Sequence, residues 1–171
     1  DSTHRSRVAG LLRRLPELQG DPIRIQNSNG LGKRRGPVHA GSFLRERRIA
    51  FDCTQAEFAR IFVHELAHFV WLRLGNPRRR RYEDLLRLEL AARARGELGW
   101  SAEVRKLALT SHVQRERSRA WREYCCESFC DTAAWHWSGL ARHAEFTLAK
   151  MHRVRRARWF EDALGRGPLS I

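Results

Sequence analysis

Residues 60–72 read Arg-Ile-Phe-Val-His-Glu-Leu-Ala-His-Phe-Val-Trp-Leu, and His64, Glu65 and His68 within them form the pattern H-E-x-x-H. On a helix, residues four apart lie on one face about one turn apart, so both imidazoles can reach a single metal ion. Glu65 would then lie beside a metal-bound water and accept its proton. The stretch therefore predicts a helix that carries a metal site.

The residues around the motif are mostly apolar, which indicates that this helix is buried. The segment Thr54–Glu57 has a capping-box pattern, and Gly75 with Pro77 marks the other end, so we expect a helix of about 20 residues. Two histidines and a glutamate are costly in a buried helix unless a partner compensates them. A bound metal ion is one such partner, and the alternative is a pair of core histidines satisfied by hydrogen bonds.

A second chemical pattern lies on the longest expected helix, where Glu127-Ser128-Phe129-Cys130-Asp131 reads E-x-x-x-D. A catalytic zinc takes three protein ligands and keeps one position open for water, and Glu127 can be the carboxylate beside two histidines. Asp131, one turn later, can accept the second ring N–H of a ligand histidine. His112 is a rival third ligand that has no carboxylate neighbour at helical spacing. The alternative is two solvated acids on a helix surface.

The order of expected elements indicates an α+β fold that is mainly helical. The first part of the chain should form a helix and then three short strands, over 3–18, 22–26, 37–44 and 48–52. After the motif helix, four further helices are expected, over 82–95, 102–109, 112–138 and 140–163, and Ser101 can cap the second of them. We expect a small N-terminal three-stranded antiparallel sheet packed on the buried motif helix. The chain should be one compact domain over 1–171, with sheet and motif helix at about 20–75 and the helical part at about 82–165.

Composition limits the setting in which the chain works. The 171 residues are enough for a real core, and no run of eighteen apolar residues predicts a membrane-spanning helix. The net charge of +14 favours an acidic partner, which can be nucleic acid, an anionic membrane or an acidic protein. The scattered arginines also suit a plain solvated surface. The densest block, Arg78–Arg81, is expected in an exposed loop after Pro77.

The four cysteines do not form a disulfide framework. Cys125 and Cys126 are adjacent and would pair only with strain, so a reducing, cytoplasmic compartment is expected. Cys126 and Cys130 are four residues apart and could hold a metal. The interpretation that we favour is that they are small buried hydrophobic residues.

Together, H-E-L-A-H at 64–68 and E-S-F-C-D at 127–131 resemble the gluzincin metallopeptidases, the thermolysin-like clan, and most of all its minimal members, the minigluzincins. The resemblance implies one zinc ion per chain with His64, His68 and Glu127 as ligands. It also implies Glu65 as general base and Asp131 as partner of a ligand histidine. The interval between His68 and Glu127 is much longer than in thermolysin.

The resemblance implies a zinc-dependent peptidase, more specifically an endopeptidase, with a peptide or protein substrate. The substrate would add as a strand along 37–44 or 48–52, with the first slightly favoured. Members of the clan often use a Tyr or His to stabilise the oxyanion, and the unranked candidates are Tyr124, His136, His143 and His152. Two other functions remain: a DNA-associated or regulator-cleaving metalloprotease whose basic surface binds nucleic acid, and a non-catalytic zinc-binding scaffold.

Overall fold

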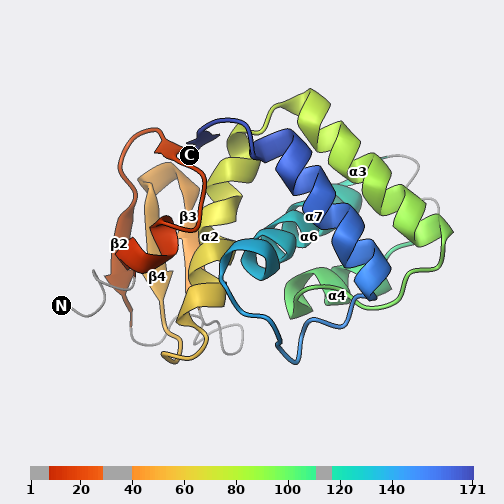
Figure 1. The fold of residues 1–171 in the computed structure, drawn as a ribbon, viewed down its shortest axis with the longest axis horizontal. Coiled ribbons are helices and arrows are strands. Elements are labelled where there is room, and N and C mark those ends of the chain that lie inside the picture. The colour runs from red at the N-terminus through yellow and green to blue at the C-terminus, as the bar shows by residue number, and fades with distance from the viewer. Residues whose placement is uncertain (1–7, 29–39, 111–116) are drawn as a thin grey trace.

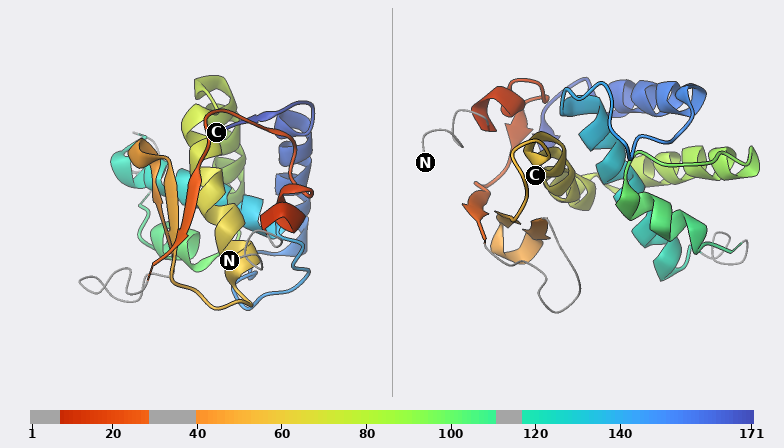
Figure 2. Two further views of the ribbon diagram at one scale, coloured as in Figure 1. Left: turned by 90° about the vertical axis from the view of Figure 1, so that its left-hand side faces the viewer. Right: turned by 90° about the horizontal axis from the view of Figure 1, so that it is seen from below.

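The computed structural model describes residues 8–28, 40–110 and 117–171, and it confirms a mainly helical α+β architecture (Figure 1). Helix α2 (Phe58–Arg73) lies in the middle, with the strands on one side and the other long helices on the opposite side. The right-hand view of Figure 2 shows the same division, seen from below. The motif helix is thus enclosed by both parts of the fold, and its apolar residues form much of the core.

The three expected strands are present as β2 (Arg24–Asn27), β3 (Ala40–Phe43) and β4 (Arg48–Phe51), in the order β2-β4-β3. Residues 37–39 of the second expected strand lie outside the described residues. Strands β3 and β4 are antiparallel, joined through a short turn of 3₁₀ helix, but β2 and β4 are parallel. The prediction of an antiparallel sheet is therefore wrong for one pair. Because β4 is the central strand, residues 48–52 do not offer a free edge to which a substrate strand could add. Strand β3 lies at an edge of the described sheet.

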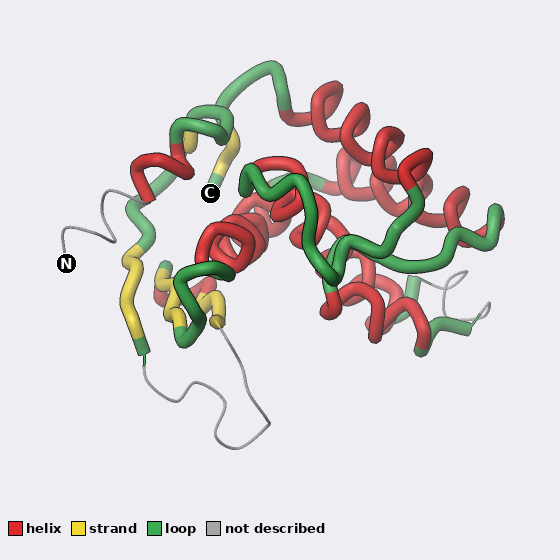
Figure 3. The backbone as a smooth tube through the Cα atoms, turned by 60° about the horizontal axis from the view of Figure 1, so that its bottom comes forward, coloured by secondary structure: helices red, strands yellow, loops and turns green. Residues whose placement is uncertain are grey.

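A two-stranded sheet, which the sequence did not predict, joins segments near the two ends of the described chain. Strand β1 (Leu18–Gln19) pairs in parallel with β5 (Leu169–Ser170). The expected helix over 3–18 is helical only over 8–12 in its described part, because the chain then turns before Pro16 and enters β1. Figure 3 shows these short strands beside the helical part of the molecule.

The limits of α2 differ from the expected ones at its beginning. The helix begins at Phe58, and Glu57 is its N-cap without a side-chain capping bond. The capping box does not form because the Glu57 carboxylate accepts hydrogen bonds from Arg60 and pairs with His143 instead. The other end is as expected, since Gly75 adopts φ +72°, a conformation that favours glycine.

The remaining helices are α3 (Asn76–Ala91), α4 (Trp100–Leu107), α6 (Arg119–Trp137) and α7 (Lys150–Leu164). Helix α6 contacts α2, α3, α4 and α7, so it is the centre of the helical part. Within the described residues, no helix combines the length and apolar character needed to cross a membrane.

Three expectations about these helices are wrong. The arginine block Arg78–Arg81 belongs to α3 rather than to a loop, because Pro77 fits in the first turn of a helix. Gly99, not Ser101, is the N-cap of α4. The last helix begins at residue 150 rather than 140, because the backbone amides of Thr147 and Leu148 both donate to the carbonyl of Glu97. Residues 112–116 of the long expected helix lie outside the described residues.

Candidate metal centre

Packing of α2 against α6 brings the two motifs together. One ligand atom each of His64, His68 and Glu127 lie within 4.8 Å of one another. The imidazole centroids are 5.1 Å apart, and His64 Nε2 lies 3.4 Å from Glu127 Oε2. Two imidazole nitrogens and one carboxylate oxygen are the donor set of a catalytic zinc, which needs no further protein ligand. The three residues expected as ligands are thus neighbours in space, and their chemistry fits zinc.

Asp131 holds the first histidine of the motif. Its Oδ1 lies 2.7 Å from His64 Nδ1, and its Oδ2 accepts a hydrogen bond of 3.0 Å from the backbone amide of Ala102 in α4. A proton on Nδ1 leaves the Nε2 lone pair of His64 free for a metal ion. Gly99 makes room for this arrangement, because a Cβ there would overlap the Asp131 carboxylate.

Residues of helix α4 also contact Glu127, and the sequence did not indicate these contacts. Ser101 Oγ donates a hydrogen bond of 2.6 Å to Glu127 Oε2, and a guanidinium nitrogen of Arg105 lies 3.5 Å from Oε1. Burial alone would raise the pKa of Glu127, but the hydrogen bond with His64, the two histidine charges and Ser101 lower it to about 2. The sequence indicated a helix cap at Ser101. Its contact with Glu127 arises only because α4 packs on α6.

The groups around His64 and His68 favour positive charge on both imidazoles. Burial opposes an imidazolium at His64, but the charge and hydrogen bond of Asp131 outweigh it and raise the pKa of His64 well above its ordinary value. The pKa of His68 is also raised, because the contact with Cys126 outweighs burial. In both cases the surrounding groups stabilise a cation where the two imidazoles meet, and a divalent ion would supply that charge.

Glu65 lies between the two histidines in sequence but makes its contact with the sheet. Its Oε2 lies 2.5 Å from Ser42 Oγ on β3, and the same hydroxyl lies 2.8 Å from the Glu65 backbone carbonyl. Glu65 is 9% exposed. The residue expected as general base is therefore held at the junction of the motif helix and the edge strand.

The four residues considered as oxyanion stabilisers make their contacts elsewhere. The Tyr124 hydroxyl donates to Glu97 at 2.6 Å, and His143 Nε2 lies 3.0 Å from a carboxylate oxygen of Glu57. His136 lies against aromatic rings of α6 and α7, and His152 is buried in α7 with its Nδ1 unpaired. None of these contacts joins a candidate to the three residues expected as zinc ligands. His112, the rival third ligand, lies outside the described residues.

No protein-family model matches this chain, and no curated protein or solved structure matches it either. The resemblance to the gluzincins therefore depends on the two motifs and on the geometry of the residues that carry them. Membership of that family stays a prediction.

Proposed function

We propose that the protein is a zinc-dependent peptidase of the gluzincin type, most similar to the minigluzincins. The observation that carries this proposal is the convergence of His64, His68 and Glu127 from two helices that are far apart in sequence. The contact between Asp131 and His64 Nδ1 supports it further, because ligand histidines usually donate their other ring N–H to a carboxylate or carbonyl. Two solvated acids on a helix surface would not make these contacts.

A bound zinc ion would lower the pKa of its water and polarise the carbonyl of a peptide bond. The residues of this chain would then do the rest of the work. Glu65 would accept the proton of the attacking water at a carboxylate oxygen and pass it to the leaving amine. Ser42 would orient that carboxylate, and Asp131 would keep the proton of His64 on Nδ1.

The substrate would be an extended peptide that adds to the sheet at β3. This strand is hydrogen-bonded to β4 on one side, lies at the edge of the sheet, and contacts the catalytic helix through Ser42 and Glu65. Addition of a strand would supply backbone hydrogen bonds that do not depend on side-chain identity. The side-chain preference of the enzyme would then come from other contacts.

The variant Glu65→Gln tests the proposal directly. We expect it to bind zinc like the unmodified protein, because Glu65 is not a ligand, and to cleave a mixed peptide library about 100- to 10,000-fold more slowly. Elemental analysis measures the zinc, and mass spectrometry measures the cleaved peptides. Ser42→Ala is the matched control, for which we expect a smaller loss of rate. Cleavage at the unmodified rate by Glu65→Gln would rule out this mechanism.

A second candidate function is a metalloprotease whose basic surface binds nucleic acid or an acidic protein. Helices α3 and α7 pack together, and each has exposed arginines, including Arg78, Arg80 and Arg81 on the first and Arg155 and Arg158 on the second. Binding to DNA should then weaken steeply with salt, because each neutralised phosphate releases counterions. Fluorescence anisotropy with labelled duplex over a range of salt concentrations measures this slope.

We also propose a reducing, cytoplasmic setting, since all four cysteines are free thiols. A non-catalytic zinc scaffold is the remaining alternative. It would need a fourth protein ligand in place of water, so X-ray absorption spectroscopy of the zinc-loaded protein separates it from an open site.

A further inference from the structure

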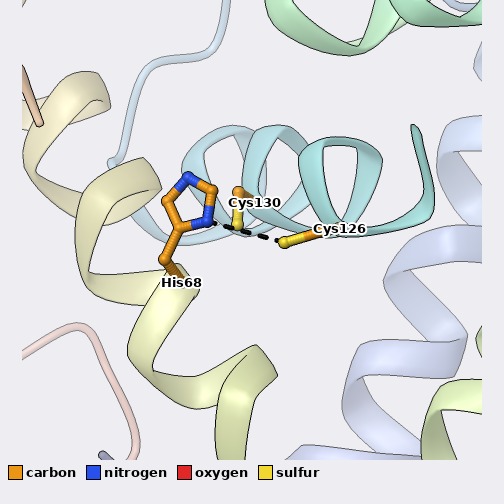
Figure 4. Close-up of side chains that lie close together, drawn as sticks. All are labelled: His68, Cys126 and Cys130. Atoms are coloured by element: carbon orange, nitrogen blue, oxygen red, sulfur yellow. Dashed lines mark hydrogen bonds between the residues drawn. The ribbon is translucent and has the colours of Figure 1, made fainter. Parts of the chain in front are cut away.

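His68 faces a second group of donors besides the one that it shares with His64. Its Nδ1 lies 3.5 Å from the sulfur of Cys126, and Cys130 lies one helical turn further along α6. One donor atom of each of these three residues lies within 4.8 Å of the others. Figure 4 shows the imidazole of α2 directed at both thiols of α6. Three metal-ligating side chains from two helices therefore converge at a point that the proposed peptidase mechanism does not use.

We propose that His68, Cys126 and Cys130 form a second metal site, which takes a thiophilic divalent cation such as Zn²⁺ or Cd²⁺. Thiolates select soft metal ions, and two cysteines with one histidine are a known donor set for zinc. The site would leave a coordination position for a solvent molecule. The proposal goes beyond the peptidase function and does not depend on it.

The balance of charge favours a divalent ion at this sulfur site. Each thiol would lose its proton to solvent as its sulfur–metal bond forms, so two thiolates and a neutral imidazole would surround the ion. The charges then sum to zero. Cys130 is completely buried and Cys126 is partly buried, and a neutral group of ligands and metal avoids the cost of a buried net charge.

The other cysteines of the chain do not have these surroundings, which makes them internal controls. Cys125 is on the same helix and is buried, but the charged groups that act on its thiol are Glu83, Arg87 and Arg117. Cys53 lies before α2, where Glu57, Asp52 and Arg60 act on its thiol. A thiol that only fills space in the core has no need of an imidazole nitrogen, and only Cys126 of the four has one at contact distance among the described contacts.

The two metal sites would compete, because they share His68. A neutral imidazole has one lone pair, so it can bind one ion at a time. An ion at the sulfur site would bind Nδ1 and leave the proton on Nε2, so His68 would have no lone pair left for an ion at the first site. A thiophilic cation should therefore exclude zinc from the site with His64 and Glu127.

Titration of the metal-free protein with Cd²⁺ tests the sulfur site, with thiolate-to-metal charge-transfer absorption as the signal. Nitrogen and oxygen ligands do not produce this absorption, so the signal is independent of cleavage. We expect a band that saturates near one ion per chain and is kept in Glu127→Ala. Cys126→Ser and Cys130→Ser should each bind Cd²⁺ about tenfold or more weakly. Cys125→Ser and Cys53→Ser should behave like the unmodified protein.

The proposal is overturned if the unmodified protein gives no charge-transfer band, or if the band persists unchanged when Cys126 and Cys130 are both replaced by Ser. Far-UV circular dichroism checks that the variants fold. X-ray absorption of the unmodified, Cd²⁺-loaded protein gives a test without any variant. Sulfur neighbours around the ion are the expected result, and a shell of nitrogen and oxygen alone contradicts the site. Loss of peptidase activity in Glu65→Gln has no bearing on either measurement.

Discussion

Two buried polar clusters lie on neighbouring faces of α6, and they differ in where their positive charge comes from. In the first, Arg156 of α7 is completely buried and pairs with Glu89 at 2.6 Å and Glu97 at 2.7 Å, while Lys106 lies 3.2 Å from Glu97. Its two carboxylates are thus matched by two protein cations. We call it the Arg156 cluster.

The second cluster, which contains the proposed zinc ligands, pairs its acids with the imidazole of His64 instead of with a buried arginine. Glu127 and Asp131 are buried or nearly so, and the nearest described arginine of this group, Arg105, is 37% exposed and 3.5 Å from Glu127. The Arg156 cluster therefore has permanent protein cations for both of its acids, whereas the second cluster depends mainly on an imidazole, an arrangement that suits the metal ion that we propose there.

The largest effect should come from removing the cation of the Arg156 cluster. Arg156→Met leaves Glu89 and Glu97 buried without their partner, so we expect the free energy of unfolding to fall by about 3–5 kcal/mol. Urea denaturation measures it. Arg158→Met is the matched control on the same helix, because Arg158 is exposed and its loss should change little. Equal stability of the two variants would contradict a structural role for the Arg156 cluster.

A smaller effect is expected from crowding the second cluster. The Cβ of Gly99→Ala would meet the Asp131 carboxylate, which would have to move away from His64. Loss of such a partner of a ligand histidine lowers metal affinity about 10- to 100-fold. Zinc titration against a competing chelator measures this change. Gly41→Ala on β3 is the control, since its Cβ would make only an ordinary contact. If both variants bind zinc equally well, Asp131 does not orient His64.

The smallest effect concerns pH and again distinguishes the clusters. Burial alone would raise the pKa of Glu97. The charge and hydrogen bonds of Arg156, together with Lys106 and Tyr124, outweigh burial and lower this pKa below its ordinary value. A lowered folded-state pKa gives stability that is present above the unfolded value and lost as pH falls through the folded one. Metal-free protein should therefore lose stability below about pH 4.5, and Glu97→Gln should have a shallower slope. Urea denaturation at several acid pH values measures both slopes, and parallel slopes would exclude this contribution.

The site was predictable from the sequence where it depends on local spacing. His64 and His68 share a face of α2, and Glu127 and Asp131 share a face of α6, because residues four apart on a helix always do. We expected the two faces to meet because buried histidines and carboxylates are costly without a partner. Contacts from outside the motifs, such as Ser42 with Glu65 and Ser101 with Glu127, depend on tertiary packing that no short pattern encodes.

Prediction of the fold was limited in the same way, because strand pairing and burial also depend on tertiary packing. Strands β2, β3 and β4 were predictable as strands, but their alternation does not state a direction, so the parallel pairing of β2 with β4 was missed. Strands β1 and β5 were not expected at all, because each has only two residues. The Arg156 cluster was missed for a similar reason. Arg156 lies among Arg153, Arg155 and Arg158, and the sequence alone does not separate this buried arginine from neighbours that are exposed or only partly buried.

The zinc content of the unmodified protein, measured by elemental analysis after gentle dialysis beside Glu127→Ala, tests the central claim most directly. We expect about one zinc per chain in the unmodified protein. Where Cys126 and Cys130 are both replaced by Ser, so that the sulfur site cannot hold zinc, we expect Glu127→Ala to cause a large loss of zinc, because three ligands become two. Absence of zinc in the unmodified protein, even after reconstitution, would contradict the metal centre. Full retention of zinc by Glu127→Ala in the protein without Cys126 and Cys130 would contradict the role of Glu127 as a ligand.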